Sequence, residues 1–460
     1  MSETLTATAH EELLAVLGDR LSTSDSILDL HGRDESSFPS CRPEAVAFVR
    51  STADVASVVR TCARHHVPVV PFGIGTSLEG HVLPTSGGVS LDLSEMNRIL
   101  EISDADLDAR VQAGVRKDQL NEALGERGLF FAVDPGADAT IGGMASTGAS
   151  GTMTVRYGTI RENVLALEVV LADGSVVRTG TRARKSSAGY DLTHLFLGAE
   201  GTLGVITELV VRVWGIPERV AAAICSLPTV RAGVEVATQI VQLGIPIARC
   251  ELVDAESVRQ MNQHSGLGEQ ETPTLLFEFH GTEAGVADQV EGVRAICDEF
   301  GGEAFRWSTK PEERAHLWRA RHDAYFAMLA ARPGSRIVTT DACVPVSRLA
   351  DCVEETIADA ALLPFVASLV GHVADGNFHV GLPIDPGSSE ERAIAEAFAA
   401  RLAERAIAMG GTCTGEHGVG IGKREYLTSE RGAGAIAVMR SLKHALDPQG
   451  LMNPGKVLPD

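Results

Sequence analysis

Short apolar runs alternate with helical repeats in the first half of the chain. Runs of this kind predict β-strands at residues 45–49, 67–71, 88–93, 164–171 and 205–213. Apolar residues at helical spacing predict helices at residues 10–30 and 115–128. Residues 51–54 resemble an N-cap box that opens another helix through Cys62. This alternation of strands and helices is typical of an α/β region.

The pattern changes after residues 214–217, Trp-Gly-Ile-Pro, which predict a domain boundary. Beyond it, a strand at residues 274–279 is followed by a long helix at residues 283–300, and a second long helix is predicted at residues 388–409. With 460 residues the chain is too long for one ordinary core. We therefore predict an α+β protein of two or three domains.

Composition narrows the possible partners and the compartment. The net charge of -21 argues against nucleic acid and against an anionic membrane surface. The cysteines are scattered without a CxxC pair, so no iron–sulfur cluster or structural zinc site is indicated, and we expect reduced thiols. The first residues lack a basic segment followed by an apolar one, and no apolar run approaches the ~18 residues of a membrane helix. We therefore expect a cytoplasmic protein, with peripheral docking to a membrane left open.

Three glycine-rich elements in the first half could receive a phosphate-bearing cofactor. In the loop after the strand at residues 67–71, Gly73 and Gly75 allow a close approach of the backbone, and Thr76 and Ser77 add hydroxyl donors. A purely structural turn explains this loop equally well. It is not a Rossmann fingerprint, because Leu78 occupies the position of the third glycine.

The second element, residues 134–151, is a dense run of Gly, Ala, Ser and Thr. Such a run is entropically costly unless a large flat ligand packs on it. The third, residues 198–204, could present backbone amides to a ring system. A disordered linker is the alternative for residues 134–151, but Ile141 and Met144 argue against it.

Histidines and a carboxylate gather in two short segments of the second half, GHVADGNFH at residues 371–379 and TGEHGVG at residues 414–420. Imidazole and carboxylate ligands suit a borderline divalent metal such as zinc or manganese, and a further histidine could move a proton. On a single strand, a spacing of seven would place His372 and His379 on opposite faces. The two would then need a bend near Gly376 to converge.

Together with NPGKV at residues 453–457, these motifs resemble a known flavoprotein family. The glycine-rich elements resemble the flavin-binding domain of the vanillyl-alcohol oxidase and p-cresol methylhydroxylase (PCMH) type. The second half resembles the FAD-linked oxidase cap of the 2-hydroxy-acid dehydrogenases. The chain is most similar to the family of D-lactate dehydrogenase (cytochrome) and the D-type subunit of glycolate oxidase. The match covers roughly residues 38–458.

The resemblance implies a PCMH-type FAD-binding domain of two α/β subdomains and an α+β cap with a ferredoxin-like sheet and helices. It implies a helical segment at residues 1–37, the FAD-binding domain at 38–217, a substrate or cap domain at 218–420, and a C-terminal segment at 421–460 that returns to the FAD domain. FAD is expected to be noncovalent, because Thr76 stands near the position of the histidine that carries flavin in covalent relatives, and His81 lies past the loop.

The resemblance also implies the residues of the site. The expected FAD-binding residues are Pro71, Gly73, Gly75, Thr76, Ser77, Pro135, Gly136, Thr140, Gly142, Gly143, Ser146, Thr147, Gly148, Ser150, Gly151, Glu200, Gly204, Ile206 and Asn453. His372, His379 and Glu416 correspond to the metal ligands, zinc or manganese, and His417 to the general base. Asn377 would contact substrate or a metal-bound water. Arg321 would bind the substrate carboxylate, although Arg319 lies close to it.

We therefore expect oxidation of D-lactate to pyruvate by hydride transfer to flavin N5, with electrons passed to a cytochrome, a quinone or an electron-transfer protein. Thr339 stands where the 2-hydroxyglutarate enzymes have lysine, which favours a monocarboxylate. The alternatives are glycolate or another 2-hydroxy acid as substrate, oxygen as acceptor, a non-catalytic subunit of a glycolate oxidase complex, or a flavoenzyme of sugar or cell-wall metabolism. A homodimer is left open.

Overall fold

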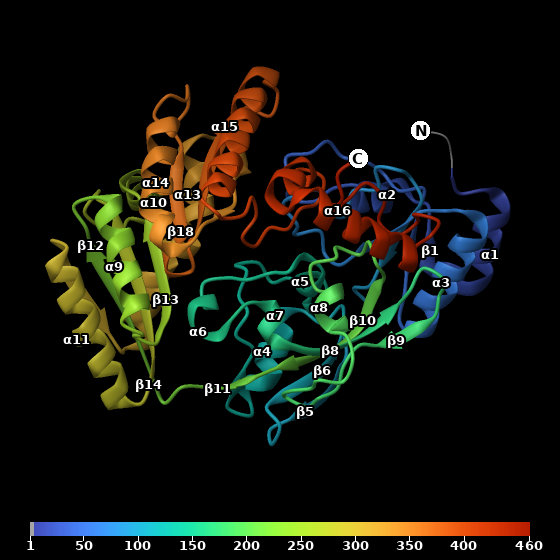
Figure 1. The fold of residues 1–460 in the computed structure, drawn as a ribbon, viewed down its shortest axis with the longest axis horizontal. Coiled ribbons are helices and arrows are strands. Elements are labelled where there is room, and N and C mark those ends of the chain that lie inside the picture. The colour runs from blue at the N-terminus through green and yellow to red at the C-terminus, as the bar shows by residue number, and fades with distance from the viewer. Residues whose placement is uncertain (1–3) are drawn as a thin grey trace. The chain divides into compact units, whose positions relative to one another are not determined.

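The computed structural model describes residues 4–460, which form two compact units. Unit 1 consists of the chain through Ser150, Gly158–Ile216 and Glu416–Asp460, and unit 2 of Gly151–Tyr157 and Pro217–Gly415. Figure 1 shows the red C-terminal segment within the same unit as the blue N-terminal segment. Each unit therefore contains segments that are distant in sequence.

Unit 1 contains two main sheets. In the first, β2 (Ala45–Phe48), β4 (Val89–Asp92) and β3 (Val69–Phe72) are parallel, and β1 (Leu21–Ser22) pairs antiparallel with β2. The second sheet is antiparallel, in the order β5 (Ile99–Ser103), β6 (Asp108–Gln112), β10 (Val205–Arg212), β8 (Val164–Val170) and β9 (Val176–Arg178). A short pair is formed by β7 (Leu129–Phe130) and β11 (Trp214–Gly215). One apolar core joins residues of both main sheets.

Helices of unit 1 connect and cover these strands. They are α1 (Ala7–Leu17), α2 (Asp25–His31), α3 (Thr52–His65), α4 (Lys117–Gly125), α5 (Ile141–Thr147), α7 (Ile160–Asn163), α8 (Leu192–Phe196) and α16 (Leu427–Leu446), with 3-10 turns at Gly18–Arg20 and Arg424–Tyr426. The predicted N-cap of α3 is confirmed, because the Ser51 side chain accepts a hydrogen bond from the Asp54 N–H.

The prediction of one helix over residues 10–30 is wrong. Helix α1 ends at Leu17, because Gly18 adopts a positive φ of 60°. Leu21 and Ser22 then pair with Ala47 and Val46 at the edge of the first sheet, and α2 starts only at Asp25. Edge pairing thus interrupts a segment whose apolar spacing alone suited a continuous helix.

Unit 2 is built on one antiparallel sheet. Its order is β15 (Glu303–Ser308), β12 (Arg219–Ser226), β14 (Thr274–Gly281), β13 (Ile247–Val253), β18 (Ser368–His372), β19 (Asn377–Ile384) and β16 (Arg336–Thr339), and β17 (Ala342–Cys343) also pairs with β19. Its helices are α6 (Thr154–Tyr157), α9 (Val230–Gln242), α10 (Ala255–Ser265), α11 (Glu283–Glu299), α12 (Pro311–His322), α13 (Ala324–Ala331), α14 (Val346–Ala360) and α15 (Ser389–Ala408). The two long helices expected at residues 283–300 and 388–409 are confirmed as α11 and α15.

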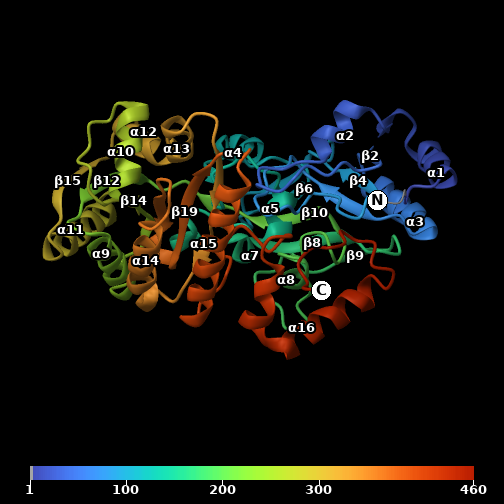
Figure 2. The same ribbon diagram turned by 90° about the horizontal axis from the view of Figure 1, so that it is seen from above.

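The two faces of this sheet differ in chemistry. Figure 2 shows α9, α11, α14 and α15 on one side and α10, α12 and α13 on the other. The first side carries a large apolar core. The second has a smaller apolar cluster around Trp318 and Val370. Its strands also carry the buried side chains of Glu251, Glu278 and His372. A buried sheet face with charged groups is where a site is expected, because burying charge needs specific partners.

Within residues 4–460, no helix is long and apolar enough to cross a membrane.

Candidate active site

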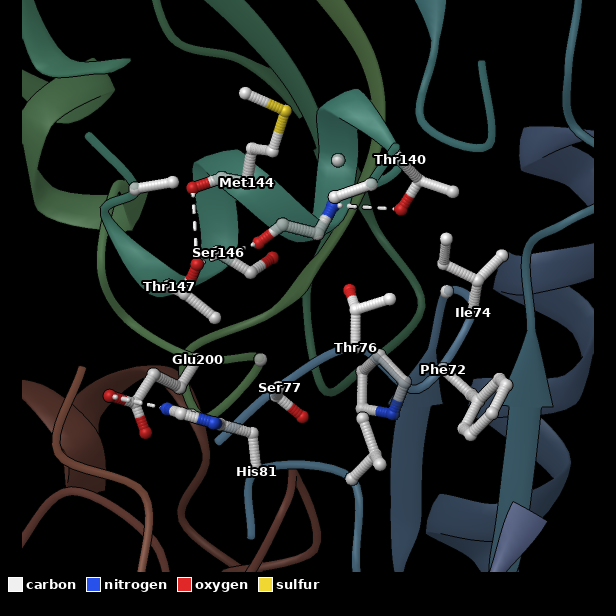
Figure 3. Close-up of a pocket in the computed structure, with 18 of the residues that line it drawn as sticks. Phe72, Ile74, Thr76, Ser77, His81, Thr140, Met144, Ser146, Thr147 and Glu200 are labelled. Carbon is white, nitrogen blue, oxygen red and sulfur yellow. Dashed lines mark hydrogen bonds and ion pairs between the residues drawn. The ribbon is translucent and has the colours of Figure 1, made fainter. Parts of the chain in front are cut away.

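A pocket in unit 1 is lined by all three glycine-rich elements. They are the loop that follows β3, the stretch around α5, and the turn that leads into β10. Figure 3 shows Thr76 and Ser77 on one side of the pocket, opposite Ser146 and Thr147 of α5. Sequence elements more than a hundred residues apart therefore meet around one hollow.

Most of the residues expected to bind FAD lie on its wall. These are Pro71, Gly73, Gly75, Thr76, Ser77, Pro135, Thr140, Gly142, Gly143, Ser146, Thr147, Ser150, Glu200, Gly204, Ile206 and Asn453. Gly136, Gly148 and Gly151 do not line it. Gly136 has a positive φ of 78° in a turn, and Gly148 caps the C-terminus of α5 with a φ of 75°. Gly151 belongs to unit 2. Gly136 and Gly148 thus allow a positive φ in the backbone and do not line the pocket.

Close packing around the pocket requires glycine at two positions. A Cβ at Gly73 would lie 2.6 Å from Thr140 Oγ1, and a Cβ at Gly142 would lie 2.6 Å from the Cβ of Ala113. Without side chains at these positions, α5 can lie close to the loop after β3 and to Ala113. A pocket of this kind fits the flat ring and the phosphates of FAD.

Sequence reasoning missed an ion pair in the pocket wall between His81 and Glu200. His81 Nε2 lies 3.3 Å from Glu200 Oε1, and both side chains are buried. Burial lowers the pKa of His81, but the charge of Glu200 and its hydrogen bond raise it more, so the net shift of the pKa is upward. Glu200 also accepts the N–H groups of Val419 and Gly420 at 2.6 and 2.8 Å. The dashed line in Figure 3 marks the pair.

Glu416 and His417 also lie on the wall of this pocket. Ser150 Oγ donates a hydrogen bond to Glu416 Oε2 at 2.7 Å, which joins the C-terminal segment to the second glycine-rich element. The expected base therefore lies in the pocket that is lined by most of the residues expected to bind FAD. The next residue toward the N-terminus, Gly415, belongs to unit 2.

In unit 2, a tight hairpin brings His372 and His379 together. Strands β18 and β19 are joined by a 3-10 turn and Gly376, which has a φ of 78°. In their register His372 faces Asn377 and Val370 faces His379, so both histidines project from the same sheet face. Their ring centroids are 5.4 Å apart. The bend that the spacing of seven demanded is present at Gly376.

Hydrogen bonds to Nδ1 orient both rings. His372 Nδ1 lies 2.6 Å from Glu251 Oε1, and His379 Nδ1 donates to the carbonyl oxygen of Thr340 at 3.0 Å. In a neutral ring these bonds place the proton on Nδ1 and the lone pair on Nε2, the nitrogen that would bind a metal. Two oriented imidazoles of this kind fit zinc or manganese.

Asn377 lies beside this pair with its amide held in place. Its Nδ2 donates to Asp341 Oδ1 at 2.8 Å and to the carbonyl of Ala342 at 2.9 Å. Thr414 Oγ1 donates to the other oxygen of Asp341 at 2.8 Å. A Cβ at Gly415 would lie 2.2 Å from Asn377 Nδ2. Gly415, in the TGEHG segment, therefore packs directly on Asn377 of the hairpin.

Arg321 lies on the same face of the sheet and shares Glu251 with His372. Its Nε donates to Glu251 Oε2 at 2.9 Å, whereas the side chain of Arg319 is exposed. Burial raises the pKa of Glu251. The charges of His372 and Arg321 and their hydrogen bonds lower this pKa by a larger amount, so the net shift is downward. Sequence reasoning missed Glu251. The alternation Arg249-Cys250-Glu251-Leu252 in a strand was the signal for a polar face.

Comparison with protein families matches both units to flavoproteins. Residues 43–180 match the FAD binding domain, and residues 216–457 match the C-terminal domain of FAD linked oxidases. A probable mitochondrial D-lactate dehydrogenase of Danio rerio is 47% identical over 96% of this chain and 90% of its own length. The chain belongs to the family of D-lactate dehydrogenase (cytochrome) and the glycolate oxidase protein GlcD.

Other members of the family match over nearly the whole chain. The mitochondrial D-lactate dehydrogenase (cytochrome) of Arabidopsis thaliana is 43% identical over 97% of this chain and 79% of its own length. The glycolate oxidase protein GlcD of Bacillus subtilis is 34% identical over 98% of this chain and 97% of its own length. The chain is therefore a FAD-dependent oxidoreductase that acts on 2-hydroxy acids.

Solved structures confirm the predicted PCMH-type fold. The substrate-bound structure of p-cresol methylhydroxylase superposes with a TM-score of 0.79 at 19% identity, over 98% of this chain and 96% of that one. At this identity the likeness concerns the fold alone.

The predicted cytoplasmic location is wrong by the same comparisons. The relatives from Danio rerio and Arabidopsis thaliana are both named as mitochondrial. The N-terminal residues and the scattered cysteines do not distinguish the cytosol from another reducing compartment.

Proposed function

We propose that the protein oxidises D-lactate to pyruvate and passes the electrons to an external acceptor such as a cytochrome. The observation that carries the proposal is the sheet face of unit 2, where two oriented histidines lie beside an arginine that shares a carboxylate with one of them. A metal-binding pair next to a carboxylate-binding cation suits a 2-hydroxy acid, which offers both a hydroxyl and a carboxylate. Relatives named D-lactate dehydrogenase at 43% and 47% identity support the choice of substrate.

The metal site of this proposal consists of His372, His379 and Glu416, with zinc or manganese as the ion. The Nδ1 contacts of the histidines leave Nε2 as the ligand atom of each, and Glu416 follows directly after Gly415, which packs against Asn377. When bound, FAD supplies the acceptor for the two electrons of the C2–H bond, and the metal supplies a Lewis acid for the 2-hydroxyl.

The remaining roles belong to side chains of the chain itself. Arg321 binds the substrate carboxylate through its guanidinium fork, and Asn377, fixed by Asp341, positions the hydroxyl or a water. His417 removes the hydroxyl proton as general base, a role that suits imidazole near neutral pH. Its place on the wall of the flavin pocket supports this assignment.

Noncovalent FAD is part of the proposal. Thr76, which lines the pocket near the position of the histidine in covalent relatives, offers a hydroxyl and no nucleophilic imidazole. His81, the histidine on the pocket wall beyond this loop, is already paired with Glu200.

Anaerobic bleaching of the flavin band at about 450 nm tests the function directly. Purified protein is mixed with D-lactate, L-lactate, glycolate or D-2-hydroxyglutarate, with and without a chelator. We expect fast bleaching with D-lactate alone and its loss with the chelator. Bleaching by glycolate in preference to D-lactate would place the chain with the glycolate enzymes instead. A protein that binds no flavin would point to a non-catalytic subunit.

A further inference from the structure

Glu251 is a carboxylate with 0% exposure at the centre of the polar sheet face of unit 2. We propose that Glu251 is a positioning residue that orients the metal-binding His372 and the substrate-binding Arg321 at the same time. The inference rests on the proposed function, because those two roles come from it. What it adds is a residue that links the metal site to the carboxylate site.

The sheet register brings Glu251 to this place. Strand β13 pairs with β18 so that Leu252 faces Gly371 and Val253 faces Val370, and the same register sets Glu251 opposite His372. Arg321 reaches the same point from α12, which covers this sheet face. The carboxylate therefore stands between an element that presents the metal-binding ring and an element that presents the cation.

Each carboxylate oxygen serves one partner. Oε1 lies 2.6 Å from His372 Nδ1, and Oε2 accepts from Arg321 Nε at 2.9 Å. The bond to Nδ1 fixes the ring so that Nε2 faces the metal position. The bond to Nε uses one edge of the guanidinium and leaves its terminal nitrogens to receive the substrate carboxylate.

Glutamine cannot replace Glu251 in both bonds. A carboxylate offers two acceptor oxygens, whereas a glutamine amide offers one oxygen and one NH₂ donor. Whichever way the amide turns, its NH₂ group faces the N–H of either His372 or Arg321. Glu251→Gln therefore keeps the volume and the burial of the side chain but loses the orientation of one partner.

The same sheet face provides a matched control in Glu278. Its Oε1 lies 2.8 Å from His280 Nε2 and 3.6 Å from Arg249 Nε, and its side chain is 10% exposed. It too is a buried glutamate between a histidine and an arginine, on the strand next to β13. Its partners have no proposed role in metal or substrate binding, so Glu278→Gln measures the effect of losing a buried charge alone.

The test compares the holoenzyme with its Glu251→Gln and Glu278→Gln variants. Metal is removed with a chelator, Mn²⁺ is added back, and its binding is followed by electron paramagnetic resonance. KM and kcat for D-lactate and thermal unfolding are then measured. For Glu251→Gln we expect a 10- to 100-fold weaker Mn²⁺ affinity and a KM for D-lactate raised by about tenfold. For Glu278→Gln we expect changes below about twofold in both, with a comparable loss of thermal stability in the two variants.

Glu251→Asp is a second variant that keeps the charge and both acceptor oxygens. We expect its Mn²⁺ affinity to lie between those of the wild type and Glu251→Gln. If Glu251→Gln does not fold, the Mn²⁺ affinity and the KM of Glu251→Asp still test the positioning role.

The outcomes separate this inference from the proposed function. A wild type that binds no Mn²⁺ and is not reduced by D-lactate would overturn the proposed function, and this inference with it. A wild type that does both, with Glu251→Gln no different from Glu278→Gln, would overturn the positioning role alone. Equal metal affinity but altered KM would also contradict it, because the proposal couples the two.

Discussion

At the scale of single residues, the buried pair of His81 and Glu200 predicts how stability depends on pH. Because the folded-state pKa of His81 is raised above 6.5, the pair stabilises the protein fully below pH 6.5 and loses this contribution as the pH rises through the raised pKa. We expect the excess Tm of the wild type over His81→Gln to be largest near pH 6 and to shrink toward pH 9. Thermal unfolding across this range measures it.

A control for this prediction is His264→Gln, which changes an exposed histidine. Its Tm difference from the wild type should be small at every pH. A difference between wild type and His81→Gln that stays constant from pH 6 to pH 9 would contradict a charged His81.

A second prediction at this scale concerns Thr339 and the preference for a monocarboxylate over a dicarboxylate substrate. It is the last residue of β16, directly before Thr340, whose carbonyl orients His379. A lysine here would supply a cation for the second carboxylate of a dicarboxylate, which otherwise is costly to bury. We expect Thr339→Lys to raise kcat/KM for D-2-hydroxyglutarate relative to D-lactate by about tenfold or more. Thr339→Met, of similar length and without charge, should leave the ratio unchanged, and an equal effect of both variants would refute the electrostatic argument.

At the scale of elements, the hairpin of β18 and β19 depends on Gly376. Its φ is 78°, and a Cβ there would lie 2.1 Å from the carbonyl oxygen of Val344. Gly376→Ala should therefore lower the free energy of unfolding by about 1–3 kcal/mol or more and weaken metal binding, because the turn sets the two histidines on one face. Chemical denaturation and Mn²⁺ titration measure the two effects.

Gly334→Ala is the matched control for the hairpin. Gly334 has a φ of 84°, and no atom lies within 4 Å of the position of its Cβ. It carries the backbone strain of a positive φ without the clash, so we expect a loss of about 1 kcal/mol and unchanged metal affinity. Equal effects of the two variants would mean that the contact with Val344 is unimportant.

Strand and helix patterns predicted most elements because each depends on local periodicity. The strand expected at residues 274–279 is β14, and residues 205–213 contain β10. The helix expected at residues 10–30 failed, because pairing of Leu21 with Ala47 is a long-range contact that local spacing does not encode.

In the candidate site, the histidines and glycines could be singled out from the sequence, because their types and flanking residues are distinctive. Glu251 was missed, since its role exists only through a register that sets it opposite His372, and Glu200 gained a partner in His81 only through the fold. Gly136 and Gly148, which are predicted to bind the cofactor, have a positive φ and do not line the pocket.

At the scale of the whole chain, the last residues complete a pocket that the first half builds. In unit 1, Met452 pairs with Val69, and the side-chain nitrogen of Lys443 donates to the carbonyls of Thr202 and Met452. Asn453 then donates from Nδ2 to the carbonyls of His81 and Glu200 at 3.0 and 2.7 Å. One amide thus holds two separate segments of the pocket wall.

Asn453→Ala should therefore release flavin. Two buried carbonyls would each lose a donor, at a cost of about 1–3 kcal/mol apiece, and the segments that carry His81 and Glu200 would no longer be tied together. We expect a lower ratio of flavin absorbance to protein absorbance after gel filtration, together with a lower Tm. Asn262→Ala is the control, because Asn262 also makes two hydrogen bonds, both to the backbone of Glu269, but in unit 2. It should lower Tm and leave the flavin content unchanged, so loss of flavin from both variants would mean that retention follows general stability rather than the link through Asn453.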